Sequence, residues 1–229
     1  MNGKKLNQLV WLLILMLCLT GCGESENGVA GKYAVSFYSN NGTVLKVDYV
    51  DKHGCATPPA IPQMEYGTVF RSWDTDFSDV TGDLSVHPVC EEYRGKTNAF
   101  AIAGGYGKSG DTVTVPVTLC GDVCVAGFDA TIIYDPEMLE LLAVNEDGAV
   151  ICNTETPGQL RINYVSVENT QADVDVCLLE FRVKAESGSA PVGMTVHSIY
   201  ACKDTVASED DSLYVQEATV LAGEVFIIP

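Results

Sequence analysis

The stretch GGYGKSGDTVTVPVTL, residues 104–119, decides the fold, because its first half is typical of one structure and its second half of another. The GKS at residues 107–109 matches the end of a phosphate-binding loop. Such a loop also needs a glycine five positions before Gly107, where Ile102 stands, and a helix directly after it, whose amide groups hold the phosphate. Residues 112–119 instead alternate between apolar and polar side chains, which is the period of a half-buried strand. The stretch therefore predicts a turn followed by a strand, and not a nucleotide site.

Similar strand-like runs follow this stretch to the end of the chain, with glycine, proline and aspartate between them. Only residues 136–142 suggest a short helical turn. Many short strands separated by turn residues favour a β-sandwich. The predicted strands lie at residues 112–119, 127–134, 159–167, 176–184, 193–200 and 219–228.

The N-terminus has the three regions of an export signal. Lys4 and Lys5 precede an apolar run at residues 9–19, which is too short to span a membrane and typical of a signal-peptide core. The following LTGC, residues 19–22, resembles a bacterial lipobox. The resemblance implies that residues 1–21 are removed as a lipoprotein signal peptide and that Cys22 carries a diacylglycerol, on the extracellular face of the cytoplasmic membrane. The alternative is an ordinary secretion signal followed by a chance cysteine.

The charge balance is strongly acidic. The chain has 13 Lys and Arg residues against 31 Asp and Glu residues, a formal net charge of −18, and removal of the leader would take Lys4 and Lys5 away. Such a surface repels nucleic acid and anionic lipid. We therefore expect no nucleic-acid partner, and we expect a membrane contact only through the lipid on Cys22.

The cysteines leave two interpretations open. The chain has nine, and those beyond Cys22 are odd in number, so an exported chain would keep at least one unpaired. Cys120 and Cys124 could close a disulfide across a tight turn, or could join His197 and Cys202 in a zinc site. The spacing matches no standard zinc motif, and the acidic residues 208–212 lack the spacing and glycine of a calcium loop. We expect no metal site in this chain.

The N-terminal part of the exported chain forms a small unit of its own. After a small polar tether at residues 22–32, residues 33–93 contain the runs SNNGTVLKVDYV, TPPAIP and FRSWDTDFSDVTGDLSVHPV. This unit resembles the Listeria–Bacteroides repeat, also called the internalin B-repeat. The resemblance implies a β-grasp-like module that serves as a spacer or an adhesin. As large aromatic side chains, Phe70 and Trp73 are expected to supply much of its packing. Residues 94–98 are expected to be a short linker.

Residues 99–229 carry a second resemblance. The segments GKSGDTVTVPVTL, VAGFDATIIYDPEMLELLAV, GQLRINYVSVENT and VCLLEFRVKAES resemble those of a cohesin domain in order and spacing. This implies an all-β fold, a nine-stranded jelly-roll β-sandwich, that binds dockerins. Dockerins are small calcium-loaded modules fused mostly to polysaccharide-degrading enzymes. The calcium belongs to the dockerin, so no cofactor is expected in this chain.

The alternation also indicates which side chains face outward. Asp129, Thr131 and Ile133 lie on the side opposite to Phe128, and Asn163 and Val165 lie on the outer side of the next predicted strand. An exposed apolar patch on a sheet suggests a partner surface, although a loop or the first module could cover Val165 and Val167. The resemblance implies that Asp129 accepts hydrogen bonds from the dockerin and that Gly127 replaces a frequent asparagine. The expected dockerin-binding residues are Gly127, Asp129, Thr131, Ile133, Asn163, Val165, Val167 and Glu168.

No catalytic motif is present in the sequence. His53, His87 and His197 lie far apart, and neither a metalloprotease helix motif nor a nucleophile elbow occurs. We therefore expect no catalysis, and the cohesin resemblance together with the lipobox implies a docking protein that attaches polysaccharide-degrading enzymes to the cell surface. The alternative is a carbohydrate-binding or adhesive lipoprotein, with a polysaccharide as its partner. Several coplanar exposed aromatic side chains would favour that alternative.

Overall fold

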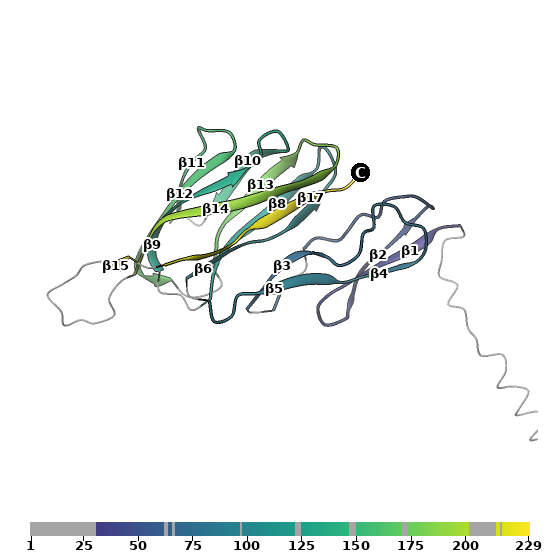
Figure 1. Ribbon diagram of the computed structural model, residues 1–229, viewed down its shortest axis with the longest axis horizontal. Coiled ribbons are helices and arrows are strands. Elements are labelled where there is room, and N and C mark those ends of the chain that lie inside the picture. The colour runs from purple at the N-terminus through teal and green to yellow at the C-terminus, as the bar shows by residue number, and fades with distance from the viewer. Residues whose placement is uncertain are drawn as a thin grey trace, which may run out of the picture.

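A computed structural model describes residues 31–61, 64–65, 67–96, 98–121, 125–146, 150–170, 174–201, 214–215 and 217–229. Every regular element in these ranges is a β-strand, which confirms the all-β class. The strands form a small N-terminal module and a larger sandwich (Figure 1). The signal peptide and Cys22 lie outside the described residues.

The N-terminal module contains a three-stranded and a two-stranded sheet. β1 (Tyr33–Tyr38) and β2 (Val44–Val50) form the antiparallel hairpin that the Asn41-Gly42 pair predicts, with Gly42 at a φ of 80° in its turn. β4 (Leu84–Val86) pairs with β1 in parallel, and β3 (Thr68–Trp73) pairs antiparallel with β5 (Pro88–Glu92). The extended segment from Leu84 to Glu92 is therefore divided at His87 between the two sheets.

Aromatic side chains fill the core of the module. Trp73 lies edge-on to Phe37 at 5.2 Å and to Phe70 at 5.3 Å between ring centroids, and Phe77 contacts Phe37 at 5.2 Å. All four rings are buried. Edge-to-face contacts of this kind add to the stabilisation from buried area, so a module this small gains much of its stability from four side chains.

The sandwich consists of two antiparallel-rich sheets that face each other. One sheet has the strand order β10-β13-β8-β6-β16, and the other has the order β11-β12-β9-β14-β17-β7, with β15 paired to β14. The first contains β10 (Leu139–Glu146), β13 (Val174–Val183), β8 (Thr112–Cys120), β6 (Ala99–Ile102) and β16 (Thr219–Leu221). The second contains β11 (Val150–Asn153), β12 (Gln159–Thr170), β9 (Val125–Tyr134), β14 (Gly188–Ala201), β17 (Gly223–Ile227), β7 (Gly105–Gly107) and β15 (Tyr214–Val215).

The first and last strands of the sandwich each pass from one sheet to the other. β6 and β16 pair in parallel within one sheet, and their continuations β7 and β17 pair in parallel within the other. If each continuation is counted with the strand before it, the described part of the sandwich has nine strands besides the two-residue β15. This agrees with the jelly roll expected from the sequence.

The opening stretch has the predicted structure. Asp111 N–H donates to the carbonyl oxygen of Lys108 at 2.9 Å, and Lys108 N–H donates to Asp111 Oδ2 at 2.9 Å, so the GKSG segment closes a tight turn before β8. The alternating apolar side chains of β8, Val113, Val115, Val117 and Leu119, are all buried in the core between the two sheets. The helical turn suggested for residues 136–142 is wrong beyond Met138, because Leu139 already begins β10.

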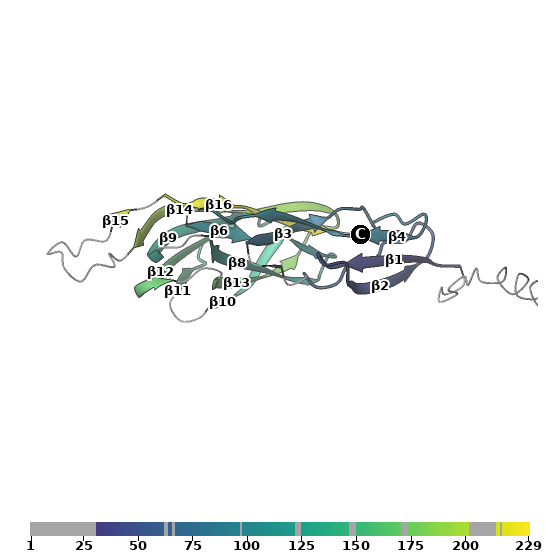
Figure 2. The ribbon, with the colours of Figure 1, turned by 90° about the horizontal axis from the view of Figure 1, so that it is seen from below.

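The module packs directly against the sandwich at the sheet crossings. Arg71 Nη1 donates to the carbonyl oxygens of Ile102 at 3.0 Å and Ala222 at 2.5 Å, and Gly104 N–H donates to the carbonyl oxygen of Phe70 at 3.2 Å. Ile228, at the end of the sandwich, is buried in the core of the module. Figure 2 shows the result, in which β3 lies beside the sandwich and β1, β2 and β4 extend beyond it.

Candidate functional site

The expected binding residues lie on the outer face of the sheet that contains β9, which we call the β9 face. β9 lies between β12 and β14, and its buried side chains alternate with outward-facing ones. Outward residues of β9 have partners on β12: Gly127 pairs with Val165, Asp129 with Asn163 and Thr131 with Arg161. The tertiary structure therefore brings together the two strands that the sequence assigned to this face.

The β9 face carries several aliphatic side chains that are largely exposed to solvent. Val165 is 75% and Ile151 is 72% exposed, the highest values among the large apolar side chains that the structure describes, and Ile133 is 48% exposed. Ile151 belongs to β11 and pairs with Asn163, one strand further from β9. The sequence analysis missed Ile151, since a four-residue strand is too short for its alternation to identify an outer side. Clustered exposure of this kind indicates a contact surface.

Asp129 is already engaged within the protein. Arg161 Nε donates to Asp129 Oδ1 at 2.9 Å, and Arg161 Nη2 forms an ion pair with Asp129 Oδ2. The side chain of Asp129 is 22% exposed, whereas that of Arg161 is 53% exposed. A carboxylate held by two guanidinium N–H groups has a fixed orientation. The expected acceptor of the face is thus bound to a neighbouring cation that was not among the expected binding residues.

Two further side-chain arrangements complete the centre of the face. Thr131 Oγ1 and His197 Nε2 lie 2.8 Å apart in a hydrogen bond from β9 to β14. Gly127 is buried, and a Cβ there would lie 3.1 Å from the carbonyl oxygen of Tyr164 and 4.0 Å from Tyr200 Cδ2. An asparagine at Gly127 would therefore require β12 to move by a few tenths of an ångström. This close contact explains why a glycine fits the position better than an asparagine.

Val167 and Glu168 belong to β12, but their side chains lie outside the described ones, so both remain sequence-based candidates. Val165 can be assessed. Its exposure of 75% shows that neither the module nor a described loop covers it. The module contacts the sandwich where β6 continues into β7 and β16 continues into β17. In the sheet that contains β9, β7 forms one edge and β11 forms the other. The module therefore leaves Ile151 and Val165 accessible.

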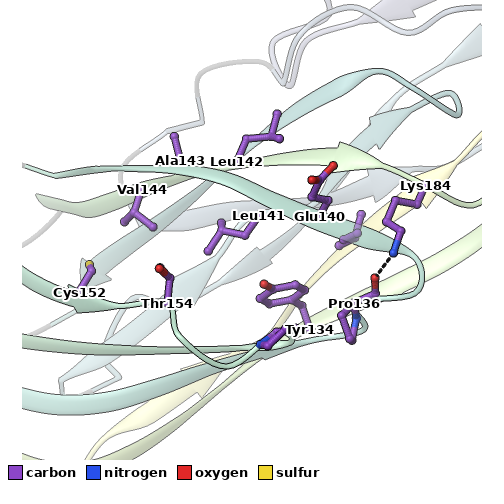
Figure 3. A pocket seen from close by; sticks show the side chains of 12 residues that line it. Tyr134, Pro136, Glu140, Leu141, Leu142, Ala143, Val144, Cys152, Thr154 and Lys184 are labelled. Carbon is purple, nitrogen blue, oxygen red and sulfur yellow. Dashed lines mark hydrogen bonds between the residues drawn. The ribbon is translucent and has the colours of Figure 1, made fainter.

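A groove of about 610 Å³ lies between the sheet edges formed by β10 and β11. Figure 3 shows that Leu141 and Val144 point toward Cys152 and Thr154 across it, while Lys184 Nζ donates to the carbonyl oxygen of Pro136 at 2.5 Å at one end. Tyr134 is its one aromatic lining residue and is 8% exposed. More generally, every described aromatic side chain is buried or half-buried, so the described surface has no fully exposed aromatic group on which a sugar ring could stack.

The metal and thiol expectations can be followed only in part. Within the described ranges no three His, Cys, Asp or Glu side chains cluster as metal ligands would, but Cys124 and Cys202 lie outside those ranges, as do residues 208–212. Burial raises the pKa of the Cys55 thiol, which makes it a poor nucleophile at neutral pH. No helix in the described part of the chain is long and apolar enough to cross a membrane.

The comparisons with known proteins concern the sandwich. The family model for the cohesin domain matches residues 99–220. Among solved structures, a type I cohesin of Pseudobacteroides cellulosolvens is 16% identical, with a TM-score of 0.49 over 56% of this chain and 90% of its own. A scaffoldin B cohesin of Acetivibrio cellulolyticus, solved in complex with a dockerin, is 23% identical, with a TM-score of 0.47 over 56% of this chain and 97% of its own.

A non-cellulosomal cohesin of the archaeon Archaeoglobus fulgidus is 15% identical, with a TM-score of 0.47 over 57% of this chain and 91% of its own. No curated protein matches the sequence. The match to the family model extends over more than half of the residues and includes β9, β11, β12 and β14, four neighbouring strands of the sheet that forms the β9 face. On that match, the chain belongs to the cohesin family.

Proposed function

We propose that this protein is a docking protein whose β9 face binds the dockerin of another protein, and that it performs no catalysis itself. The observation that carries the proposal is the pair of highly exposed aliphatic side chains, Ile151 and Val165, beside hydrogen-bonding groups on one sheet of a cohesin domain. Interfaces between proteins combine such a dry apolar centre with a polar surround. The calcium of the complex would belong to the dockerin.

The leader sequence supports a location for this docking. We propose that Cys22 is lipidated and holds the protein on the extracellular face of the cytoplasmic membrane, since two acyl chains suffice for stable anchoring. β1, which follows the tether, and β11, at the edge of the β9 face, lie at opposite ends of the molecule (Figures 1 and 2). The module would therefore hold the face away from the bilayer.

The docked partners proposed are polysaccharide-degrading enzymes. Capture at the surface would keep an enzyme, and the sugars it releases, near the cell at a high local concentration. A carbohydrate-binding function is the competing proposal, and the fact that every described aromatic side chain is at least half-buried weighs against it.

The test is a direct binding measurement. Mature protein carrying Cys22→Ala is presented to a panel of isolated dockerin modules by biolayer interferometry, with calcium and then with a chelator. We expect saturable binding to at least one dockerin, lost when calcium is removed. The same protein is incubated with insoluble cellulose, xylan and chitin. Binding to a polysaccharide and to none of the dockerins would replace the docking function with the carbohydrate-binding one.

A further inference from the structure

We propose that Arg161, and not Asp129, is the charged residue of the β9 face that contacts the partner, and that the docked dockerin places a carboxylate side chain against it. This inference rests on the docking function proposed above and specifies the chemistry of the partner. The family resemblance suggested the reverse arrangement, with Asp129 as the acceptor for groups of the dockerin.

Arg161 is more accessible to a partner than Asp129 is. Both carboxylate oxygens of Asp129 already accept from Arg161, through Nε at 2.9 Å and through Nη2. A guanidinium has five N–H donors, so this pair leaves three of them for another acceptor. Arg161 is also more than twice as exposed as Asp129, at 53% against 22%. A partner approaching the face therefore meets unused N–H donors before it meets a free carboxylate oxygen.

The ion pair between Arg161 and Asp129 favours an anionic partner group over a cationic one. A partner cation that approached Asp129 would lie beside the guanidinium of Arg161, a like charge, which costs free energy at short range. A partner carboxylate would add to the existing arrangement, since a guanidinium can serve one carboxylate on each of two sides. The local geometry therefore favours an acidic contact, even though the chain as a whole is acidic.

Arg161 is the one Lys or Arg side chain of the described sandwich that lies on the β9 face, close to its exposed apolar residues. Of the four described cations of the sandwich, Lys108 donates to the carbonyl oxygen of Pro229, Arg182 pairs with Glu140, and Lys184 donates to Pro136, all away from the β9 face. Arg161 alone lies on the face, two residues along β12 from Asn163, which pairs with Ile151. Once docked aliphatic side chains cover Ile151 and Val165, water is excluded and the ion pair strengthens.

The experiment compares four variants of the mature, full-length Cys22→Ala protein with the isolated calcium-loaded dockerins that bind it. Arg161→Gln removes the charge, Arg161→Lys keeps the charge without the planar fork, and Asp129→Asn leaves Arg161 in place without its anchor. Arg182→Gln is the matched control, because Arg182 is 50% exposed and pairs with Glu140 at 3.0 Å on the other sheet. Urea unfolding curves check that all variants fold.

We expect Arg161→Gln to weaken dockerin binding about ten- to a hundredfold, Arg161→Lys to weaken it less, and Arg182→Gln to leave it unchanged. Asp129→Asn should weaken it less than Arg161→Gln, because Asp129 acts by holding Arg161. Replacing the surface carboxylates of the dockerin one at a time should identify one whose loss has no further effect in the Arg161→Gln background.

Three results would overturn the inference. The first is unchanged or tighter binding by Arg161→Gln together with strong loss in Asp129→Asn, which would make Asp129 the contact and leave the docking function intact. The second is that no dockerin carboxylate couples to Arg161, which also leaves docking intact. The third is that the unsubstituted protein binds no dockerin, which removes the docking function and this inference together.

Discussion

The hydroxyl oxygen of Tyr106 accepts a hydrogen bond from the backbone N–H of Trp73 at 3.0 Å. Tyr106 belongs to β7 of the sandwich, whereas Trp73 ends β3 of the module. The ring of Tyr106 also stacks on Phe226, at 4.8 Å between centroids, and contacts Phe77 at 5.7 Å. One side chain of the sandwich thus completes both the hydrogen bonding and the packing of the module, so the two parts should gain stability from each other.

Replacement of Tyr106 by phenylalanine tests this coupling. Tyr106→Phe keeps the ring but leaves the buried N–H of Trp73 without its acceptor, and we expect a loss of about 1–3 kcal/mol in the free energy of unfolding. Urea denaturation followed by tryptophan fluorescence measures it. The control is Tyr38→Phe, since the hydroxyl of Tyr38 has no hydrogen-bond partner among the described residues. Equal stability of both variants would contradict the prediction.

The same tyrosine should make stability depend on alkaline pH. Burial raises the pKa of Tyr106 above its ordinary value of 10.0. A raised pKa means that the unfolded chain ionises first, so the contribution of the neutral hydroxyl is complete below about pH 10 and is lost as the pH rises through the folded pKa. Denaturation midpoints measured from pH 8 to pH 11.5 should fall at the alkaline end, and less steeply in Tyr106→Phe. Parallel curves for the two proteins would exclude this role.

Gly104 lies where the backbone of the module approaches the sandwich closely. A Cβ there would lie 2.3 Å from the carbonyl oxygen of Arg71, a contact that backbone must relieve by moving. We expect Gly104→Ala to destabilise the protein by about 1–3 kcal/mol and to increase proteolysis between the two parts. Gly82→Ala is the control, because a Cβ at Gly82 meets nothing within 4 Å. Limited proteolysis and urea denaturation read out the difference.

A carboxylate introduced at Val165 on the β9 face should abolish binding of the dockerin without changing the stability of the fold. Val165 is 75% exposed, so Val165→Asp should change the free energy of unfolding by no more than about 0.5 kcal/mol. It should nevertheless abolish dockerin binding, because the docked interface would bury an unpaired carboxylate. Val89→Asp, at a 42% exposed valine of the module, should bind as the unsubstituted protein does. Retained binding by Val165→Asp would move the interface away from β12.

The proposed lipid anchor depends on the thiol of Cys22. Cells expressing the protein with its leader are grown with an alkyne fatty acid, and incorporation is detected by click labelling. We expect label and membrane fractionation in the unsubstituted protein, and neither in Cys22→Ala. Cys55→Ala, which changes a half-buried thiol of the module, serves as the control. Label that persists in Cys22→Ala would show that the lipobox prediction is wrong.

Sequence reasoning performed best where structure is local. The strand of residues 112–119 and its turn could be predicted because alternation and turn chemistry involve only neighbouring residues. The same period assigned Asp129, Thr131 and Ile133 to one outward side, and the structure shows them there. The helical turn past Met138 was predicted wrongly, because β10 becomes extended through its pairing with the distant β13.

For the candidate site, the sequence predicted which side chains face outward, but not which of them contact one another. Asp129 and Arg161 are 32 residues apart, and their ion pair exists because the register of β9 and β12 puts Thr131 opposite Arg161 and Asn163 opposite Asp129. Ile151 enters the face only because β11 pairs with β12. A shift of one residue in either register would change these contacts, and periodicity alone does not determine register.

The amino-acid sequence by itself determined the strand-rich class of this protein, the faces of its long strands and the cohesin resemblance, because each depends on residue order over short distances. Only the tertiary structure decided that Arg161 holds Asp129, that Ile151 and Val165 share an exposed surface, and that Ile228 completes the core of the module. These relationships join residues far apart in the chain. They arise from sheet pairing and from the close packing of complementary shapes, which no local pattern encodes.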